Sequence, residues 1–295
     1  MISEELFLAL TKRIEKTMGV ELQQVSLNAV SGGDTHRAYR LDSDKQSIFL
    51  KVNQRANSHL LASEYKSLCA IHSSVVGNLY PTPYFNFEFG EIAVMGISLL
   101  SIGSLDCQNA EKSAQGLIKQ HQITGRAFGW ESSNFIGASP QSNEWSESWP
   151  HFFSHQRLLP QCEWAKKRGL APDLGKKIKS ITDRLDDLLI SQKSAPCLLH
   201  GDLWSGNLGY QTDRDQIALV DPAPYYGDPE ADIAMTKLFA SLPDEFYQQY
   251  RGHFKAPDKE QAVHAIYNLY HALNHFNLFG ASYEGLIRAL LQRIK

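Results

Sequence analysis

Short runs of β-branched and aromatic residues, broken by Gly, Asp and Ser, dominate the first hundred residues of the chain. Runs of this kind are typical of β-strands, and the residues that break them are typical of turns. The pattern predicts strands at residues 25–30, 38–41, 47–52, 84–89 and 91–97. Residues 1–20 and 56–73 have apolar side chains at helical spacing, and each is predicted as a helix.

Beyond residue 98 the hydrophobic period is mostly that of helices. Helices are predicted at residues 110–124, 149–168, 174–192, 231–241 and 259–277. Residues 125–145, rich in Gly, Ser, Asn and aromatics, are predicted as an ordered loop. Residues 197–223 interrupt the helices with two short β runs around a polar loop. We therefore expect an α+β fold with a small β-rich N-lobe, residues 1–97, and a larger, mainly helical C-lobe, residues 98–295.

Composition narrows the class of protein. The 295 residues are 43% hydrophobic and 21% charged with a net charge of -3, as in an ordinary globular protein of two lobes. A nucleic-acid binder normally shows a basic excess, so no nucleic-acid partner is expected. Apolar runs fall short of the ~20 residues that span a bilayer, and no signal peptide is recognised. The four cysteines form no CxxC pair, which favours reduced thiols in a cytoplasm.

The stretch 199–207, which reads LHGDLWSGN, carries the strongest chemical signal. Asp202 and Asn207 lie on one polar loop, and the β run that follows ends in Asp221. Phosphoryl transfer needs a carboxylate that orients or deprotonates the acceptor hydroxyl, and Mg²⁺ held by hard oxygen ligands. The pattern predicts Asp202 as the catalytic residue, with Asn207 and Asp221 as metal ligands. A turn in which Asp and Asn cap local backbone groups is the alternative.

A nucleotide-gripping half is predicted in the N-lobe. Gly32 and Gly33 fall between two β runs, where small residues let backbone N–H groups approach phosphate oxygens, although a plain hairpin turn has the same pattern. Lys51 ends a β run, as the ATP-binding lysine of protein kinases does. Glu64 in the next helix is its expected partner.

Two alternatives remain open for this pair. A lysine at the end of a strand is often simply solvated, and Glu88 and Glu91 are rival acids for it.

Three segments resemble one family of kinases. Residues 198–207 read LLHGDLWSGN, residues 221–227 read DPAPYYG, and residues 49–53 read FLKVN. Together they resemble the fructosamine kinase (ketosamine 3-kinase) family, which is related to the aminoglycoside and choline kinases. Looser likenesses near residues 128–129, 143–153 and 273–277 extend the resemblance over nearly the whole chain.

The resemblance implies a two-lobed protein-kinase-like fold, ATP and Mg²⁺ as cofactors, and a ketosamine as substrate. The implied reaction phosphorylates the 3-hydroxyl of a sugar carried on an amine, such as a ribulosamine or fructosamine of lysine, and so removes glycation damage. Gly96, Ile97 and Ser98 fall where the family holds adenine by backbone hydrogen bonds. Many members have a Glu-His pair there, so the Gly-Ile of this chain leaves nucleotide preference open.

Roles for a few further residues follow from their places in these motifs. Trp204 and Tyr225 are candidates for contacting the sugar, because aromatic faces commonly hold sugars, but such residues are also ordinary core. Asp232 is expected to support the catalytic loop by hydrogen bonds, and His200 to act as scaffold.

Rival functions are an aminoglycoside- or choline-like acceptor and an inactive nucleotide-binding scaffold. The joint presence of Lys51, Asp202, Asn207 and Asp221 argues against the scaffold. The sequence leaves open the preferred sugar, free or protein-bound substrate, and the oligomeric state.

Overall fold

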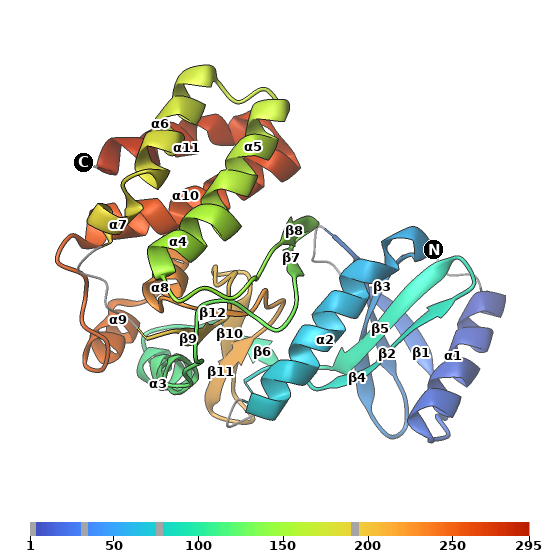
Figure 1. The fold of residues 1–295 in the computed structure, drawn as a ribbon. Coiled ribbons are helices and arrows are strands. Elements are labelled where there is room, and N and C mark those ends of the chain that lie inside the picture. Colours follow the sequence, from blue (N-terminus) through green and yellow to red (C-terminus); the bar gives the residue numbers. More distant parts are fainter. Residues whose placement is uncertain (1–3, 31–34, 75–78, 190–194, 295) are drawn as a thin grey trace. The chain divides into compact units, whose positions relative to one another are not determined.

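The computed structural model describes residues 4–30, 35–74, 79–189 and 195–294, and of Ser74 only the backbone. The chain folds into two compact units, Met1–Ser101 and Ile102–Lys295 (Figure 1). They are called the N-terminal and the C-terminal unit below, and each is described by itself. Among the described helices, none is long and apolar enough to cross a membrane.

A five-stranded antiparallel sheet forms the centre of the N-terminal unit, in the order β1-β2-β3-β5-β4. Its elements are α1 (Glu4–Met18), β1 (Ser26–Val30), β2 (Arg37–Asp42), β3 (Ser47–Gln54), the short 3₁₀ turn η1 (Arg55–Asn57), α2 (Ser58–Ser74), β4 (Pro83–Phe89) and β5 (Ile92–Ser98). The central position of β3 matters for function, because strands on both sides fix every residue along it.

The two faces of β3 have different tasks. Successive side chains of a strand point to opposite faces of its sheet. Ile48, Leu50 and Val52 point to one face and join a hydrophobic cluster with Leu10 and Ile14 of α1. The residues between them point to the other face, which α2 covers (Figure 1). The charged side chain of Lys51, between Leu50 and Val52, therefore points to the face that α2 covers and is buried there.

The C-terminal unit is mainly helical, with three small sheets. Its helices are α3 (Ala110–His121), α4 (Trp149–Phe153), α5 (Leu159–Lys167), α6 (Pro172–Thr182), α7 (Leu185–Leu188), α8 (Glu230–Thr236), α9 (Asp244–Arg251), α10 (Glu260–Phe279) and α11 (Glu284–Arg293), with a π-helical turn η2 (Ser154–Leu158) and a 3₁₀ turn η3 (Ala281–Tyr283). Its strands are β6 (Ile102–Gly103), β7 (Asn134–Ile136), β8 (Ser139–Gln141), β9 (Cys197–Leu199), β10 (Leu208–Gln211), β11 (Gln216–Leu219) and β12 (Tyr225–Gly227). They pair as β11-β10-β6, β12-β9 and β7-β8.

Helix α10 is the centre of this unit. Nearly every residue from Val263 to Asn277 is buried, on all sides of the helix. A helix that is buried all round normally carries apolar residues throughout. Here Asn268, His271 and Asn274 are buried as well, so the interior of the unit contains polar side chains.

The structure corrects several sequence-based predictions. The helix predicted at 174–192 is broken into α6 and α7, and its end lies outside the described residues. The helix predicted at 149–168 passes through η2, and the loop predicted at 125–145 contains the hairpin β7-β8. Helices α9 and α11 were not predicted. Short elements of these kinds are set by tertiary packing more than by local pattern.

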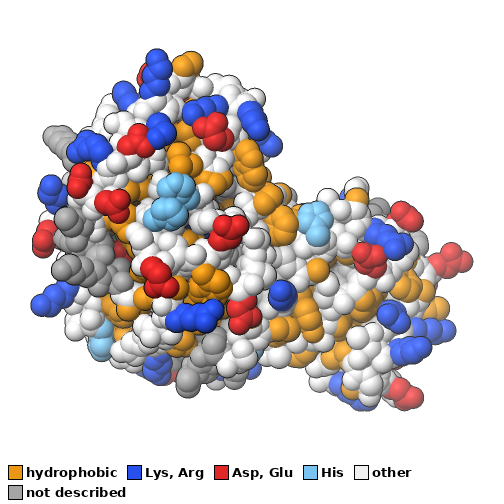
Figure 2. Space-filling view, viewed as in Figure 1, with side chains coloured by type: hydrophobic (Ala, Val, Ile, Leu, Met, Phe, Trp, Pro, Cys, Tyr) orange, Lys and Arg blue, Asp and Glu red, His pale blue; other side chains and the backbone are white. Residues whose placement is uncertain are grey.

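Charges of both signs mix on the face of the molecule that Figure 2 draws. Among the residues that are coloured in that view, Lys and Arg are interspersed with Asp and Glu, and they form no continuous basic stripe.

Candidate active site

The polar loop between β9 and β10 carries Asp202 near its start and Asn207 at its end. The Asn207 side-chain nitrogen donates to the backbone oxygen of Asp202 over 2.9 Å and lies 3.3 Å from Asp202 Oδ2. The Asn207 backbone N–H donates to the Trp204 oxygen over 2.9 Å, which closes the loop. An amide nitrogen only donates hydrogen bonds, so the side-chain oxygen is the atom that Asn207 can offer to a cation. The structure therefore brings together the first two predicted site residues.

Glycine is required just before Asp202. Gly201 has a φ of +84°, and a Cβ atom built there would lie 2.0 Å from the backbone oxygen of Ala223. Only glycine adopts such a conformation at little cost, and only glycine lets the two chains approach so closely. The close approach is fixed by a hydrogen bond of 2.9 Å from the Ala223 N–H to the His200 oxygen.

A carboxylate from α8 holds the start of the loop. Asp232 accepts the backbone N–H of His200 over 2.7 Å and that of Gly201 over 2.9 Å. It also lies 3.2 Å from Nε2 of His121. Burial alone would raise the pKa of Asp232, but the hydrogen bonds from His121 and from the His200 backbone help to outweigh burial and lower the pKa. The predicted supporting role of Asp232 is confirmed.

The ring of His200 ties the loop to the next strand. Its Nε2 lies 2.8 Å from the Val220 oxygen, and its Nδ1 accepts the Asp202 N–H over 3.2 Å. These contacts place the ring proton on Nε2. Burial lowers the pKa of His200, so the ring is neutral. The predicted scaffold role of His200 is confirmed as well.

Asp221 follows β11 and is exposed, with a φ of +54° that is unusual for a residue other than glycine. The Val220 N–H donates to the backbone oxygen of Asn207 over 2.9 Å, so Asp221 is tied to the end of the loop. Burial, and then the charges of Asp221 and Asp232, raise the pKa of Asp202 to about 7. The carboxylate of Asp221 and the amide oxygen of Asn207 are hard oxygen donors, which fit Mg²⁺.

In the N-terminal unit, Lys51 on β3 and Glu64 on α2 form the predicted ion pair. Lys51 Nζ lies 2.6 Å from Glu64 Oε1, and the side chains are only 8% and 14% exposed. The rival acid Glu88 pairs instead with Arg55 over 2.8 Å, where both side chains are largely exposed. Pairing of Lys51 with Glu64 is therefore confirmed, while their contact with phosphate stays a prediction.

Gly32 and Gly33 fall in the segment 31–34, outside the described residues. The strands on either side are described: β1 ends at Val30, which pairs with Ala38 of β2. The segment therefore connects two neighbouring antiparallel strands, and its predicted contact with phosphates stays a prediction.

The predicted adenine-binding residues lie inside a strand. Gly96, Ile97 and Ser98 belong to β5, between β3 and β4, and the Ser98 N–H donates to the Thr82 oxygen over 2.9 Å. The ring of Phe85 covers Gly96, where a Cβ atom would lie 2.3 Å from Phe85 Cζ. Their adenine contact stays a prediction, and backbone groups outside the strand begin only after Ser98.

The two predicted substrate aromatics have different surroundings. Trp204 is 37% exposed; its ring covers Gly206 and meets the edge of Phe239 at 6.3 Å between ring centroids. Tyr225 is 1% exposed and lies 4.0 Å below the guanidinium of Arg157. The position of Tyr225 agrees with the alternative reading, ordinary core packing, and Trp204 stays a candidate for substrate contact.

Arg157, on the π-helical turn η2, was missed by sequence analysis. It is fully buried, and its guanidinium lies against the rings of Tyr225 and Phe152 at 4.0 and 4.7 Å. It donates to the Ser142 oxygen and to Asn143 Oδ1, each over 2.6 Å. Its recorded partners among the described residues are neutral oxygens and rings. A buried cation of this kind is held by dipoles and π faces rather than by a counter-ion.

The amides beside Arg157 support the segment that follows Asp221. Asn134 donates to the Pro224 oxygen over 2.9 Å, and Gln141 donates to the Ala223 oxygen over 3.2 Å. Gln141 and Asn143 both donate to Asn134 Oδ1. Amides within the aromatic-rich segment 125–145 were the sequence signal that could have identified this network.

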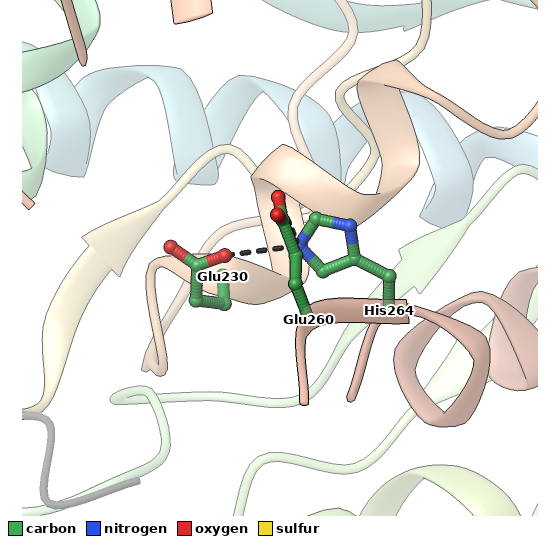
Figure 3. A group of neighbouring side chains, drawn as sticks. All are labelled: Glu230, Glu260 and His264. Atoms are coloured by element: carbon green, nitrogen blue, oxygen red, sulfur yellow. Dashed lines mark hydrogen bonds and ion pairs between the residues drawn. The ribbon is translucent and has the colours of Figure 1, made fainter. Parts of the chain in front are cut away.

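A second charged cluster lies on α8, α9 and α10. Glu230, Glu260 and His264 bring their ligand atoms within 4.8 Å of one another, with His264 Nε2 2.9 Å from Glu230 Oε2 (Figure 3). Arg251 contacts both oxygens of Glu230 at 2.5 and 2.9 Å, and Glu260 also accepts from Lys237 over 2.9 Å. Because these cations already offset the carboxylates, the cluster is an ion-pair network that fixes α8, the helix of Asp232.

Residues 7–295 match the family described as fructosamine kinase. A protein of Synechocystis described as a probable ketoamine kinase is 35% identical over 286 residues, 96% of this chain and 95% of that protein. A chloroplastic protein-ribulosamine 3-kinase of Arabidopsis thaliana is 31% identical over 284 residues, 93% of this chain and 84% of that protein.

Solved structures agree on the fold. A protein of Haemophilus somnus assigned as a fructosamine-3-kinase superposes with a TM-score of 0.84 at 25% identity, over 97% of this chain and 96% of that one. An ADP-bound aminoglycoside phosphotransferase superposes with a TM-score of 0.62 at 15% identity, over 99% and 97% of the two chains. The predicted kinase-like α+β fold is thereby confirmed.

Proposed function

This chain belongs to the fructosamine kinase family, and we propose that it transfers the γ-phosphoryl group of ATP to a sugar hydroxyl of a ketosamine, the 3-hydroxyl of a ribulosamine or fructosamine. The observation that supports this most is the loop from His200 to Asn207, whose backbone is fixed by Asp232 while the carboxylate of Asp202 remains one-fifth exposed. A rigid loop with one accessible carboxylate suits a reaction in which positioning supplies most of the rate.

In the proposed mechanism Asp202 accepts a hydrogen bond from the acceptor hydroxyl and takes its proton as the bond to phosphorus forms. Its pKa is raised to about 7, close to neutral pH. A general base works best when its pKa lies near the pH at which the enzyme operates. Asn207 and Asp221 would hold Mg²⁺ by the amide oxygen and the carboxylate. When bound, the ion neutralises charge on the phosphate oxygens.

Lys51 supplies a fixed positive charge for the α- and β-phosphates of ATP. Its contact of 2.6 Å with Glu64 restrains a side chain that would otherwise sample many rotamers. Because both groups are mostly buried between β3 and α2, the ammonium is held in place before the nucleotide binds.

The expected product is a ketosamine 3-phosphate, which is less stable than the starting adduct, so the physiological outcome would be removal of glycation from amines. The cytoplasm is the proposed location, since all four cysteines are free.

A panel of acceptors tests the proposal. Purified protein with ATP and Mg²⁺ is given ribulosyl-lysine, fructosyl-lysine, kanamycin and choline, and ADP release and the phosphorylated product are measured. Phosphorylation of a ketosamine is expected, with none of kanamycin or choline. The 3-deoxy analogue of the best ketosamine is the matched control, and it should accept no phosphate. Phosphorylation of kanamycin or choline with none of any ketosamine would overturn the proposed substrate.

A further inference from the structure

One buried histidine on the central helix of the C-terminal unit faces the proposed catalytic residue. His271 on α10 is 4% exposed, and its Nδ1 lies 3.9 Å from Asp202 Oδ1. Among the described residues, this buried Nδ1 has no hydrogen-bond partner. An unpaired buried polar atom costs about 1–3 kcal/mol, so its retention beside a reactive carboxylate calls for a reason.

The two oxygens of the Asp202 carboxylate face different side chains. Oδ2 lies 3.3 Å from the Asn207 nitrogen, and Oδ1 faces His271. The separation of 3.9 Å is too long for a hydrogen bond, and a movement of about 1 Å would bring it into the usual range. The backbone of Asp202 is held by its N–H bond to His200, so rotation of the carboxylate is the movement that would close the gap.

A neutral donor is suited to this position. Burial, and then the neighbouring His275, lower the pKa of His271 to about 3, so the ring is uncharged near neutral pH. A neutral N–H restrains a carboxylate without cancelling its charge, whereas a lysine or arginine there would hold Asp202 ionised and reduce its basicity.

We propose that His271 is a positioning residue for Asp202: with its proton on Nδ1 it donates a hydrogen bond to Oδ1 when the acceptor sugar binds, and so fixes the plane of the carboxylate toward the reacting hydroxyl. This inference rests on the proposed function, in which Asp202 orients and deprotonates that hydroxyl.

Two substitutions at one position separate positioning from packing. His271→Asn keeps an N–H near the place of Nδ1 but leaves a cavity, whereas His271→Leu fills more of the space and has no donor. If His271 positions Asp202, His271→Asn should retain kcat within about fivefold, and His271→Leu should lower kcat about 10- to 100-fold. KM for ATP should be unchanged in both variants. If His271 only packs the core, kcat should instead be lower for His271→Asn than for His271→Leu, because the cavity that His271→Asn leaves destabilises the core. A kcat for His271→Leu equal to or above that of His271→Asn would overturn the inference.

His264 provides the matched control on the same helix. It too is buried and lies 2.9 Å from a carboxylate oxygen, that of Glu230, but it faces the ion-pair network. His264→Asn and His264→Leu should both lower Tm, and their kcat values should agree within about twofold. A large preference for Asn at both positions would mean that the donor acts through stability, which would also overturn the inference.

Asp202→Asn tells the two possible failures apart. If this variant keeps near wild-type turnover, Asp202 is not the base, and both the proposed mechanism and the role of His271 fail. If it is inactive while His271→Leu is fully active, only the role of His271 fails. In the Asp202→Asn background, His271→Leu should lower the residual kcat less than twofold, since a positioning residue acts only through the group it positions.

Discussion

The two candidate half-sites treat charge in opposite ways. In the N-terminal unit, the ammonium of Lys51 is matched by Glu64 at 2.6 Å, so its charge is compensated within the protein. In the C-terminal unit, Asp202 lies near Asp221 and Asp232, and their like charges contribute to its raised pKa. The first half is a close pair of opposite charges, whereas the second gathers carboxylates of like charge around Asp202.

This difference suggests what each half contributes. A compensated pair gains rigidity, and it holds the lysine that we propose to bind phosphate in one place at little electrostatic cost. Carboxylates that lie close together in a low dielectric are costly, and a divalent cation relieves that cost on binding. We infer that the neighbouring carboxylates of the C-terminal half lower the stability of the protein and raise its affinity for a cation.

The largest effect is expected at the half that gathers like charges. Asp202→Asn should lower kcat about 10²- to 10⁴-fold, because the amide cannot accept the hydroxyl proton. It should not lower Tm in metal-free buffer, because it removes one of the mutually repelling charges. Steady-state kinetics and calorimetry measure the two quantities. A fall in both kcat and Tm would mean that Asp202 mainly supports the fold.

The compensated half should respond in the opposite way. Lys51→Met leaves Glu64 mostly buried without its cation, which destabilises a protein by about 3 kcal/mol or somewhat less, since the pair is slightly exposed. Turnover should fall too. The double variant Lys51→Met with Glu64→Leu should regain stability but not activity, as followed by urea unfolding and kinetics.

The exposed pair Arg55–Glu88 is the control for that experiment. Arg55→Met should cost only about 0–1 kcal/mol. Equal losses for Lys51→Met and Arg55→Met would contradict the idea that burial makes the first pair special.

A smaller effect is expected for the affinity of the nucleotide. Asp221→Ala should weaken Mg-ATP binding at least about tenfold, because it removes a charged oxygen ligand. Calorimetric titration measures this directly. Asp215 offers a matched control: it is an exposed aspartate on the turn after β10, and its φ of +53° is close to that of Asp221. Loss of affinity in Asp215→Ala as well would point to backbone strain rather than to metal binding.

The smallest effect concerns pH. A carboxyl whose pKa is raised on folding, here from 3.8 to about 7, binds protons more tightly when folded. Its contribution to stability is therefore greatest below about pH 4 and is lost as the pH rises to 7. With EDTA present, the Tm of Asp202→Asn minus that of the wild type should grow by a few degrees (about 2–4 °C per kcal/mol) between pH 5 and pH 8. A difference independent of pH would mean that Asp202 titrates normally.

Much of this arrangement could be predicted from sequence because its signals are local. Lys51 stands at a strand end, Asp202 and Asn207 share one loop, and Asp232 follows a short turn. Such residues are set by neighbours along the chain. The fold class follows from the change in hydrophobic period near residue 98.

What the sequence did not predict depends on contacts between distant segments. His271 is one of several polar residues in a mostly apolar helix, and only tertiary packing brings it to a loop some seventy residues earlier. Arg157 reads as an ordinary exposed position of an amphipathic helix, whereas it is buried between aromatic rings from two separate segments. No local pattern carries such information, because it arises from which helix faces meet.

The π-helical turn between α4 and α5 also limits how this protein can change in length. A π turn contains one residue more than an α-helix needs for the same stretch, and it commonly arises where a single residue has been inserted. Loss of one residue from Ser154–Leu158 would restore an ordinary helix and turn the side chains on one side by about 100° relative to the other. Phe152 and Arg157 could then no longer both contact the ring of Tyr225. Insertions and deletions that exposed loops tolerate are therefore excluded from this helix.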